Sequence, residues 1–143
     1  FFEWHTGPNA KTPYFIKAES APIFSLACVT DTWVDTNSGE SMHTFSILTT
    51  AANTLMGKIH NTKNRMPVIL AKEDEHLWLN PTTSENQIQE MLRPFPSEKL
   101  MAFQVSRKLN NPRIERNLPF AINPLSYDIP EPGQERDLFS QID

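Results

Sequence analysis

The chain has 143 residues, of which 38% are hydrophobic and 21% are charged. That is enough to bury one core and too little for two comfortable domains. No apolar run approaches the roughly 18 residues that span a bilayer, and no secretory signal is visible. The net charge of −4 argues against nucleic-acid binding by bulk attraction, so any contact with DNA needs a local strip of Lys and Arg.

The only cysteine, Cys28, lies in the apolar run 24–29. A single cysteine cannot form an internal disulfide, and this one is expected to be a small core residue. Its setting offers no neighbouring cation to stabilise a thiolate, which argues against a nucleophile. This cysteine usage is typical of a reducing compartment, so we expect an intracellular protein, cytoplasmic if the source is bacterial.

The first half of the chain predicts strands, because aromatic and β-branched residues gather there in short runs. The runs are 1–4, 11–16, 24–33 and 43–49. Turn residues at 5–9 separate the first two runs, and a hairpin loop at 35–40 separates the last two. The mostly apolar run 24–33 is expected to be a buried strand. Since the sequence opens in mid-strand without an initiator Met, we expect that an N-terminal segment was removed or truncated.

The second half alternates short helices with strands. Thr50 is expected to cap a helix over 51–59, whose apolar residues recur at i, i+3, i+4 and i+7. Ser84 is expected to cap an amphipathic helix that ends at 92, and Trp78 is expected to pack inward just before it. The other predicted elements are one or two helical turns over 73–79 and strands over 66–70 and 100–105.

Together these elements predict an α+β fold: a curved, barrel-like, mostly antiparallel sheet with short peripheral helices. Residues 1–128 form one domain in this interpretation, and residues 129–143 form a solvated C-terminal tail. Twelve prolines and only four glycines agree with short elements joined by many loops.

The sequence lacks the motifs that bind metals or nucleotides. The histidines are not spaced like a zinc ligand set, and no cysteine pair accompanies them. There is no glycine-rich phosphate loop and no Rossmann fingerprint. We therefore expect neither a metal nor a cofactor.

Two residues are candidates for proton transfer. His60 follows the predicted helix, where the helix C-terminus favours an imidazolium and a titration near neutral pH suits acid–base chemistry. The alternative, which spacing alone favours, is a surface histidine that neutralises the helix dipole. Glu3 lies between aromatic residues, which tend to raise the pKa of a carboxyl group and make it a general acid. The alternative is a charge on an edge strand that discourages sheet pairing.

Arg65 and Thr49 are candidates for contacts with a ligand. Arg65 precedes a Met-Pro turn, where its planar side chain is suited to clamp a phosphate; an ordinary exposed arginine is the alternative. Thr49 lies where a predicted strand ends and a helix follows, and simple capping is the strong alternative. Taken singly, neither residue identifies a site.

Five short motifs occur in order along the chain: 1–4 (FFEW), 11–16 (KTPYFI), 45–53 (FSILTTAAN), 59–70 (IHNTKNRMPVIL) and 105–112 (VSRKLNNP). This series resembles the SRAP family, the SOS-response-associated peptidases or abasic-site-processing proteins, over most of positions 1–125. Each motif alone has little specificity, whereas their order is specific. The resemblance makes residues 1–128 the C-terminal portion of a single SRAP domain.

The resemblance implies a compact α+β domain with a positively charged groove for single-stranded DNA that contains abasic sites. Family members react through an N-terminal cysteine, which is exposed when they remove their own initiator Met. The α-amine forms a Schiff base with the sugar aldehyde, and the thiol closes it into a thiazolidine. The resemblance gives Glu3 the role of proton shuttle and His60 a role in ring opening and crosslink reversal. It further implies that Arg65 contacts the DNA backbone and that Thr49 lines the same pocket.

The chain departs from the family pattern in two places. The family's nucleophilic cysteine and an orienting asparagine lie upstream of the glutamate motif, and this chain contains neither region. The segment between His60 and Arg65 is also longer than the compact form of this motif in some members.

Three functions remain open at this point. The first is a monomeric abasic-site DNA–protein crosslinking enzyme that acts away from membranes, with its nucleophile outside these residues. The second is a non-catalytic single-stranded-DNA-binding module of the DNA damage response. General proteolysis ranks last, because the peptidase activity of the family is the removal of its own first residue.

Overall fold

The computed structural model describes residues 1–125, so the predicted tail at 129–143 lies outside the described residues. The strands are β1 (Phe2–Thr6), β2 (Lys11–Ala18), β3 (Cys28–Val34), β4 (Ser41–Ile47), β5 (Thr49–Ala51), β6 (Arg65–Pro67) and β7 (Leu100–Gln104). The helices are α1 (Thr54–Ile59), α2 (Glu75–Trp78) and α3 (Glu85–Met91), with 3-10 turns η1 (Ser97–Lys99), η2 (Arg107–Asn110) and η3 (Pro119–Ala121). No helix in this part of the chain is long and apolar enough to cross a membrane.

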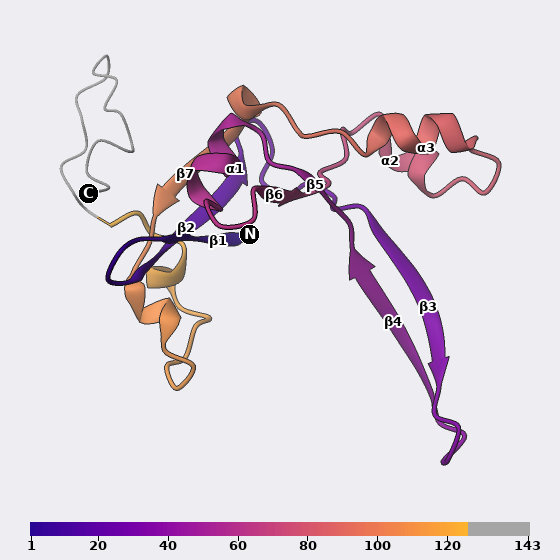
Figure 1. The fold of residues 1–143 in the computed structure, drawn as a ribbon, viewed down its shortest axis with the longest axis horizontal. Coiled ribbons are helices and arrows are strands. Elements are labelled where there is room, and N and C mark those ends of the chain that lie inside the picture. Colours follow the sequence, from indigo (N-terminus) through magenta and orange to yellow (C-terminus); the bar gives the residue numbers. More distant parts are fainter. Residues whose placement is uncertain (126–143) are drawn as a thin grey trace.

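The strands of residues 1–125 form three small antiparallel sheets (Figure 1). The first has the order β1-β2-β7, whereas β3–β4 and β5–β6 are two-stranded. The predicted antiparallel α+β fold is therefore confirmed. The described sheets do not close on one another, so the predicted barrel-like curvature is not confirmed.

The main core lies between α1 and the β1-β2-β7 sheet. Met56 and Ile59 of the predicted helical stripe are fully buried, in one cluster with Tyr14 and Ile16 of β2. Burying an apolar side chain of this size stabilises the fold by roughly 1.5–3 kcal/mol. This packing fixes the position of the C-terminal turn of α1 relative to the sheet.

The helix α1 begins later than predicted, and its N-cap is Asn53 rather than Thr50. The Asn53 Oδ1 accepts a hydrogen bond from the Met56 N–H at 2.8 Å, and its Nδ2 donates to the Phe95 carbonyl at 2.6 Å. Thr50 is unavailable as a cap because it lies in β5, opposite Met66 of β6. A tertiary pairing here overrides the local helix signal.

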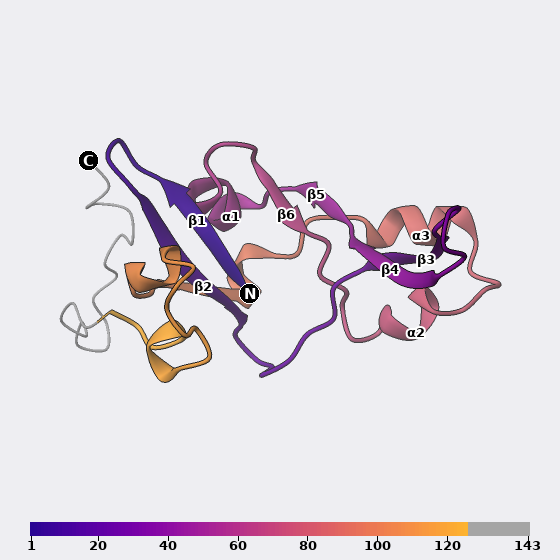
Figure 2. The ribbon, with the colours of Figure 1, turned by 90° about the horizontal axis from the view of Figure 1, so that it is seen from below.

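The β3–β4 hairpin has the predicted pairing but not the predicted burial. β3 begins at Cys28 rather than at residue 24, and a loop with Gly39 at φ +75° closes the hairpin within 35–40, a conformation that glycine adopts without strain. The hairpin projects away from the other sheets (Figures 1 and 2). Six of its large apolar side chains are 46% to 70% exposed: Val29, Trp33, Val34, Met42, Phe45 and Ile47. The prediction of a buried strand was wrong because no described element covers these side chains.

Three segments meet at the base of the hairpin through a ring of backbone hydrogen bonds. The Leu48 N–H donates to the Ala27 carbonyl, the Ala27 N–H to the Val68 carbonyl, and the Val68 N–H to the Leu48 carbonyl, each at 2.9 Å. Ala27 and Val68 are buried in a second apolar cluster with Met91 of α3. The ring anchors the hairpin to the β5–β6 sheet.

The helices α2 and α3 agree with the predictions for residues 73–92. Ser84 caps α3 in a capping box with Gln87, in which each side chain bonds to the backbone N–H of the other residue. Trp78 is half-buried against the second apolar cluster, as expected. Capping residues and the spacing of apolar residues were therefore sufficient to predict the helices of this region.

Replacing Asn53 with alanine is expected to lower the free energy of unfolding by about 2 kcal/mol, because it removes both the cap acceptor and the donor to Phe95. The Asn53→Asp variant keeps the acceptor and should lose about half as much. Urea unfolding followed by circular dichroism measures both values. Thr50→Ala is the matched control, and a larger loss for this variant than for Asn53→Ala would return the cap to Thr50.

Candidate functional site

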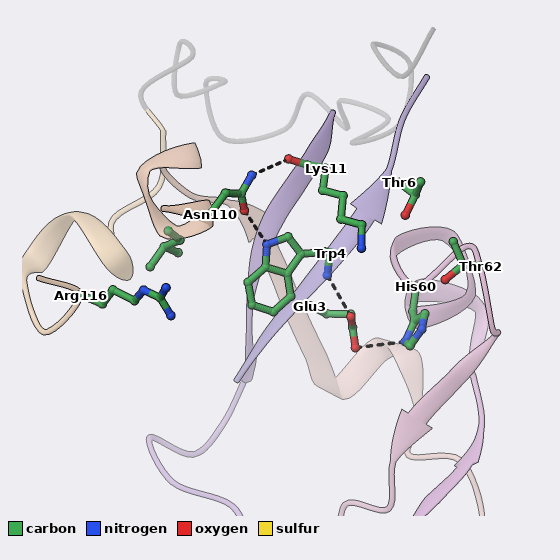
Figure 3. Close-up of a pocket in the computed structure, with 9 residues that line it drawn as sticks. Glu3, Trp4, Thr6, Lys11, His60, Thr62, Asn110 and Arg116 are labelled. Carbon is green, nitrogen blue, oxygen red and sulfur yellow. Dashed lines mark hydrogen bonds and ion pairs between the residues drawn. The ribbon is translucent and has the colours of Figure 1, made fainter. Parts of the chain in front are cut away.

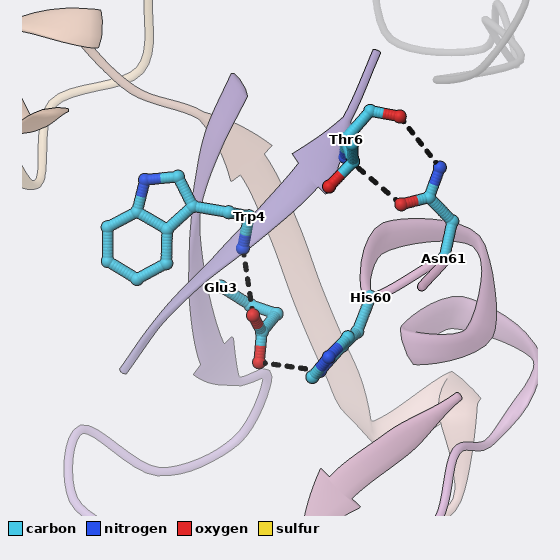
Figure 4. Close-up of polar contacts among 5 residues, drawn as sticks. All are labelled: Glu3, Trp4, Thr6, His60 and Asn61. Carbon is cyan, nitrogen blue, oxygen red and sulfur yellow. Dashed lines mark hydrogen bonds and ion pairs between the residues drawn. The ribbon is translucent and has the colours of Figure 1, made fainter. Parts of the chain in front are cut away.

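The structure brings Glu3 of β1 and His60, the C-cap residue of α1, into direct contact (Figure 4). The Glu3 Oε2 lies 3.1 Å from the His60 Nδ1, and the two side chains are 20% and 21% exposed. The other carboxylate oxygen of Glu3 accepts a hydrogen bond from the Trp4 backbone N–H at 2.9 Å. Both carboxylate oxygens are therefore held, and the pair remains partly open to solvent.

This geometry defines the roles of the two ring nitrogens of His60. A carboxylate only accepts hydrogen bonds, so the His60 Nδ1 carries a proton when Glu3 is ionised. The Nε2 of His60 is then the nitrogen that exchanges a proton with a bound molecule. A carboxylate that fixes the tautomer of a histidine in this way is a recurrent arrangement for acid–base chemistry.

Two further contacts fasten β1 to the end of α1 beside the pair. The His5 ring is buried, and its Nδ1 donates to the Lys58 carbonyl at 2.9 Å, since a carbonyl only accepts. The Asn61 side chain bonds twice to the backbone of Thr6 (Figure 4): its Oδ1 accepts from the N–H and its Nδ2 donates to the carbonyl, both at 3.0 Å. Asn61 thus continues the hydrogen bonding of β1 toward the loop that carries His60.

The loop after His60 forms a turn that is closed by backbone hydrogen bonds. The Asn64 N–H donates to the His60 carbonyl at 3.1 Å, and the Asn64 carbonyl accepts from the Ala52 N–H at 2.9 Å. Asn64 has φ 49°, a left-handed conformation that asparagine tolerates better than most residues. The longer segment between the histidine and the Arg-Met-Pro motif is thereby accommodated.

A cavity of about 670 Å³ opens beside the pair (Figure 3). Its lining comes from β1, β2, the loop after α1 and the segment from η2 onward: Glu3, Trp4, Thr6, Lys11, His60, Thr62, Leu109, Asn110 and Arg116. Two cationic side chains, Lys11 and Arg116, therefore lie on the same cavity as the Glu3–His60 pair. The volume is within the range of small-ligand sites in proteins.

Asn110 of η2 organises the wall of the cavity opposite α1. The Trp4 Nε1 donates to the Asn110 Oδ1 at 2.8 Å, and the Asn110 Nδ2 donates to the Lys11 carbonyl at 3.0 Å. One side chain thus fixes the indole ring and joins η2 to both strands of the β1–β2 hairpin (Figure 3).

Arg65 and Thr49 lie together, but not in this cavity. The register of β5 and β6 pairs Thr49 with Pro67 and Ala51 with Arg65, so all four residues share one face of the two-stranded sheet. Arg65 and Thr49 are exposed there, and neither belongs to the cavity lining. The contact of Arg65 with the DNA backbone and the place of Thr49 in the DNA-binding site stay predictions.

Cys28 also lies away from the cavity. It is half-buried at the start of β3, opposite Ile47 of β4. Among residues 1–125, no group of three or more His, Cys, Asp or Glu side chains is arranged to hold a metal ion.

Sequence reasoning found the pair and missed most of the cavity around it. Trp4, Lys11 and Asn110 all lie in motifs that were recognised, yet no role followed from their types. Strand alternation gave the wrong signal for Trp4, because it places Trp4 and Glu3 on opposite faces of β1, whereas both residues line the cavity. No pattern in the sequence pointed to Arg116.

Comparison with known proteins identifies similar chains. The family model "SOS response associated peptidase (SRAP)" matches residues 1–112. The abasic site processing protein YoqW of Bacillus subtilis is 39% identical over 115 residues, which cover 79% of this chain and 50% of YoqW. The abasic site processing protein HMCES of Xenopus tropicalis is 29% identical over 132 residues, covering 79% of this chain and 38% of HMCES.

A crystal structure of a Bacteroides thetaiotaomicron protein has the same fold, with a TM-score of 0.82 and 40% identity. The match covers 87% of this chain and 53% of that protein. The chain thus spans about half the length of the bacterial relatives that it matches. The ordered motifs, the fold and the family model agree, and the chain belongs to the SRAP family.

Proposed function

We propose that this chain is the part of an abasic-site processing protein that carries the acid–base pair of a DNA–protein crosslinking reaction. The contact between Glu3 and His60 at a cavity with two cationic side chains is the observation that supports it. The names of YoqW and HMCES as abasic site processing proteins support the same substrate. The partner is then single-stranded DNA that contains an abasic site.

The first step is the opening of the abasic sugar. In its closed form, C1 bears a hydroxyl group, and the aldehyde appears only when that hydroxyl loses a proton and the ring oxygen gains one. A base and an acid within reach of the sugar accelerate such a proton exchange, typically by 10²–10⁴-fold. The His60 Nε2 is suited to this exchange because Glu3 holds the opposite side of the ring.

The second step forms the covalent link. The α-amine of an N-terminal cysteine, which is not among these 143 residues, attacks C1, and the resulting hydroxyl leaves as water to give an imine. The thiol sulfur then adds to C1 and its proton passes to the nitrogen, which closes a thiazolidine. Glu3 is proposed to carry protons to and from the departing hydroxyl, and His60 to assist the reversal. Removal of the initiator Met by the protein itself would first expose the cysteine.

A second candidate function is single-stranded-DNA binding without a covalent step. The cations Lys11 and Arg116 on the cavity, and Arg65 on the exposed face of β6, favour it because they neutralise phosphates without any proton transfer. DNA binding without an adduct, when the N-terminal cysteine segment is present, would select this function.

The Glu3→Gln variant is expected to slow crosslinking by 10²–10⁴-fold, because the amide neither carries protons nor fixes the His60 tautomer in the same way. The assay joins residues 1–143 to the N-terminal cysteine segment and follows the adduct with an abasic single strand by denaturing electrophoresis and intact mass. Glu40→Gln, in the exposed hairpin loop, is the matched control. An unchanged adduct rate in Glu3→Gln would refute the assigned role.

Asn61 is predicted to position His60, and Asn61→Ala should slow crosslinking roughly tenfold, since small misplacements of catalytic groups have large effects on rate. The free energy of unfolding should fall by only about 1 kcal/mol. Imidazole ¹H–¹⁵N spectra provide the distinguishing measurement, because the Nδ1–H signal of His60 should weaken in Asn61→Ala and partly return in Asn61→Asp, which keeps the acceptor for Thr6. Crosslinking at the normal rate with an altered His60 signal would show that the position of the ring does not matter.

A further inference from the structure

We propose that the Trp4 indole is a stacking platform for the nucleobase next to the abasic site. This inference rests on the proposed function, because it assigns a second part of the same cavity to the neighbouring nucleotide. An opened abasic sugar has no base of its own, so the cavity of about 670 Å³ has room for more than the lesion. Trp4 lines that cavity beside Glu3, and Figure 3 shows its ring between Glu3 and Arg116.

The hydrogen bond to Asn110 determines how Trp4 can recognise a base. The indole has one polar group, the Nε1–H, and this group already donates to the Asn110 Oδ1 at 2.8 Å. Trp4 therefore has no donor left for the edge of a base, and recognition must use the face of its ring. Stacking of this kind accepts all four bases, because every base has a π-face.

Asn110 also holds the ring in place before any ligand arrives. Its second hydrogen bond, to the Lys11 carbonyl at 3.0 Å, ties it to β2, so the indole is fixed against the β1–β2 hairpin. A fixed aromatic ring loses little conformational entropy on binding. Asn110 is thus a positioning residue for the platform and touches the nucleotide only through Trp4.

The charges on the same cavity match a nucleotide rather than an apolar ligand. Lys11 and Arg116 line it, and within residues 1–125 neither side chain forms an ion pair with a carboxylate. A nucleotide beside the lesion brings one phosphate with its base, and cations that flank an aromatic ring are the usual combination in single-strand sites.

The test uses the 143-residue chain and DNA single strands in which one nucleotide is replaced by tetrahydrofuran, an abasic analogue that cannot form an aldehyde. Fluorescence anisotropy measures the affinity for a strand in which every other base is present. It also measures the affinity for two strands that lack the base on the 5′ or the 3′ side of the analogue. One of these two deletions should weaken binding roughly tenfold. In Trp4→Ala the same deletion should have no effect, whereas Trp4→Phe should keep part of it.

A second measurement leaves Trp4 in place, in case its replacement impairs folding. In a Trp33→Phe/Trp78→Phe chain, Trp4 is the only tryptophan, and its fluorescence should be quenched by the strand with the neighbouring base and not by the strand without it. In Asn110→Ala on this background, quenching should require several-fold more DNA. Asn111→Ala, next to it in the sequence, is the control.

The proposal would be overturned if removal of neither neighbouring base changed the affinity of the wild-type chain. It would also be overturned if the loss of affinity on base removal persisted in Trp4→Ala. Quenching by both strands alike would also overturn it. These outcomes are distinct from failure of the proposed function. Crosslinking with no effect of the neighbouring base on affinity would refute only the stacking role of Trp4. An effect of the neighbouring base without crosslinking would refute only the covalent reaction.

Discussion

The attachment of the C-terminal turn of α1 to β1 is the constraint on which the site depends. Apolar packing of Met56 and Ile59 sets the helix against the sheet, but packing alone does not fix the rotation of its last turn. The hydrogen bonds from His5 to the Lys58 carbonyl and between Asn61 and Thr6 do so. The Glu3–His60 contact forms within this frame.

The frame explains why the proposed acid–base pair lies on a strand and at a helix end instead of on two loops. Catalytic side chains need positions that other groups enforce, and strands and helices provide such positions better than long loops. The Glu3 carboxylate accepts a hydrogen bond from the backbone N–H of Trp4. His60 is followed by a turn in which the Asn64 N–H donates to the His60 carbonyl. The cavity is thus shaped by short-range contacts around two residues that are far apart in the sequence.

How much of this could be predicted from the sequence depends on the range of the interactions. The capping box of Ser84 and Gln87 was predictable because both partners lie within one helical turn. Alternation at the start of the chain was also predictable: Phe1, just before β1, packs on the first core cluster, and Phe2 packs on another cluster near η2 and η3. The N-cap of α1 was not predictable, because Thr50 is taken up by a strand pairing with Met66 that no local pattern contains, and Asn53 caps the helix instead.

The candidate site shows the same limit. Spacing alone left both Glu3 and His60 with ordinary explanations, and only the order of the five motifs joined them. The hydrogen bond between Trp4 and Asn110 spans 106 residues and has no periodic or compositional signal. The exposure of β3 was unpredictable for a related reason, because an apolar run does not say whether another layer will cover it.

The bare β3–β4 hairpin has a consequence for the behaviour of the chain in solution. Within residues 1–125 it has two seven-residue strands, each with one edge that no described strand pairs, and a set of large apolar side chains in contact with water. Exposed apolar edges of this kind add strands from neighbouring molecules. The hairpin therefore gives the chain a route to self-association that lies away from the cavity beside Glu3 and His60 and does not depend on its chemistry.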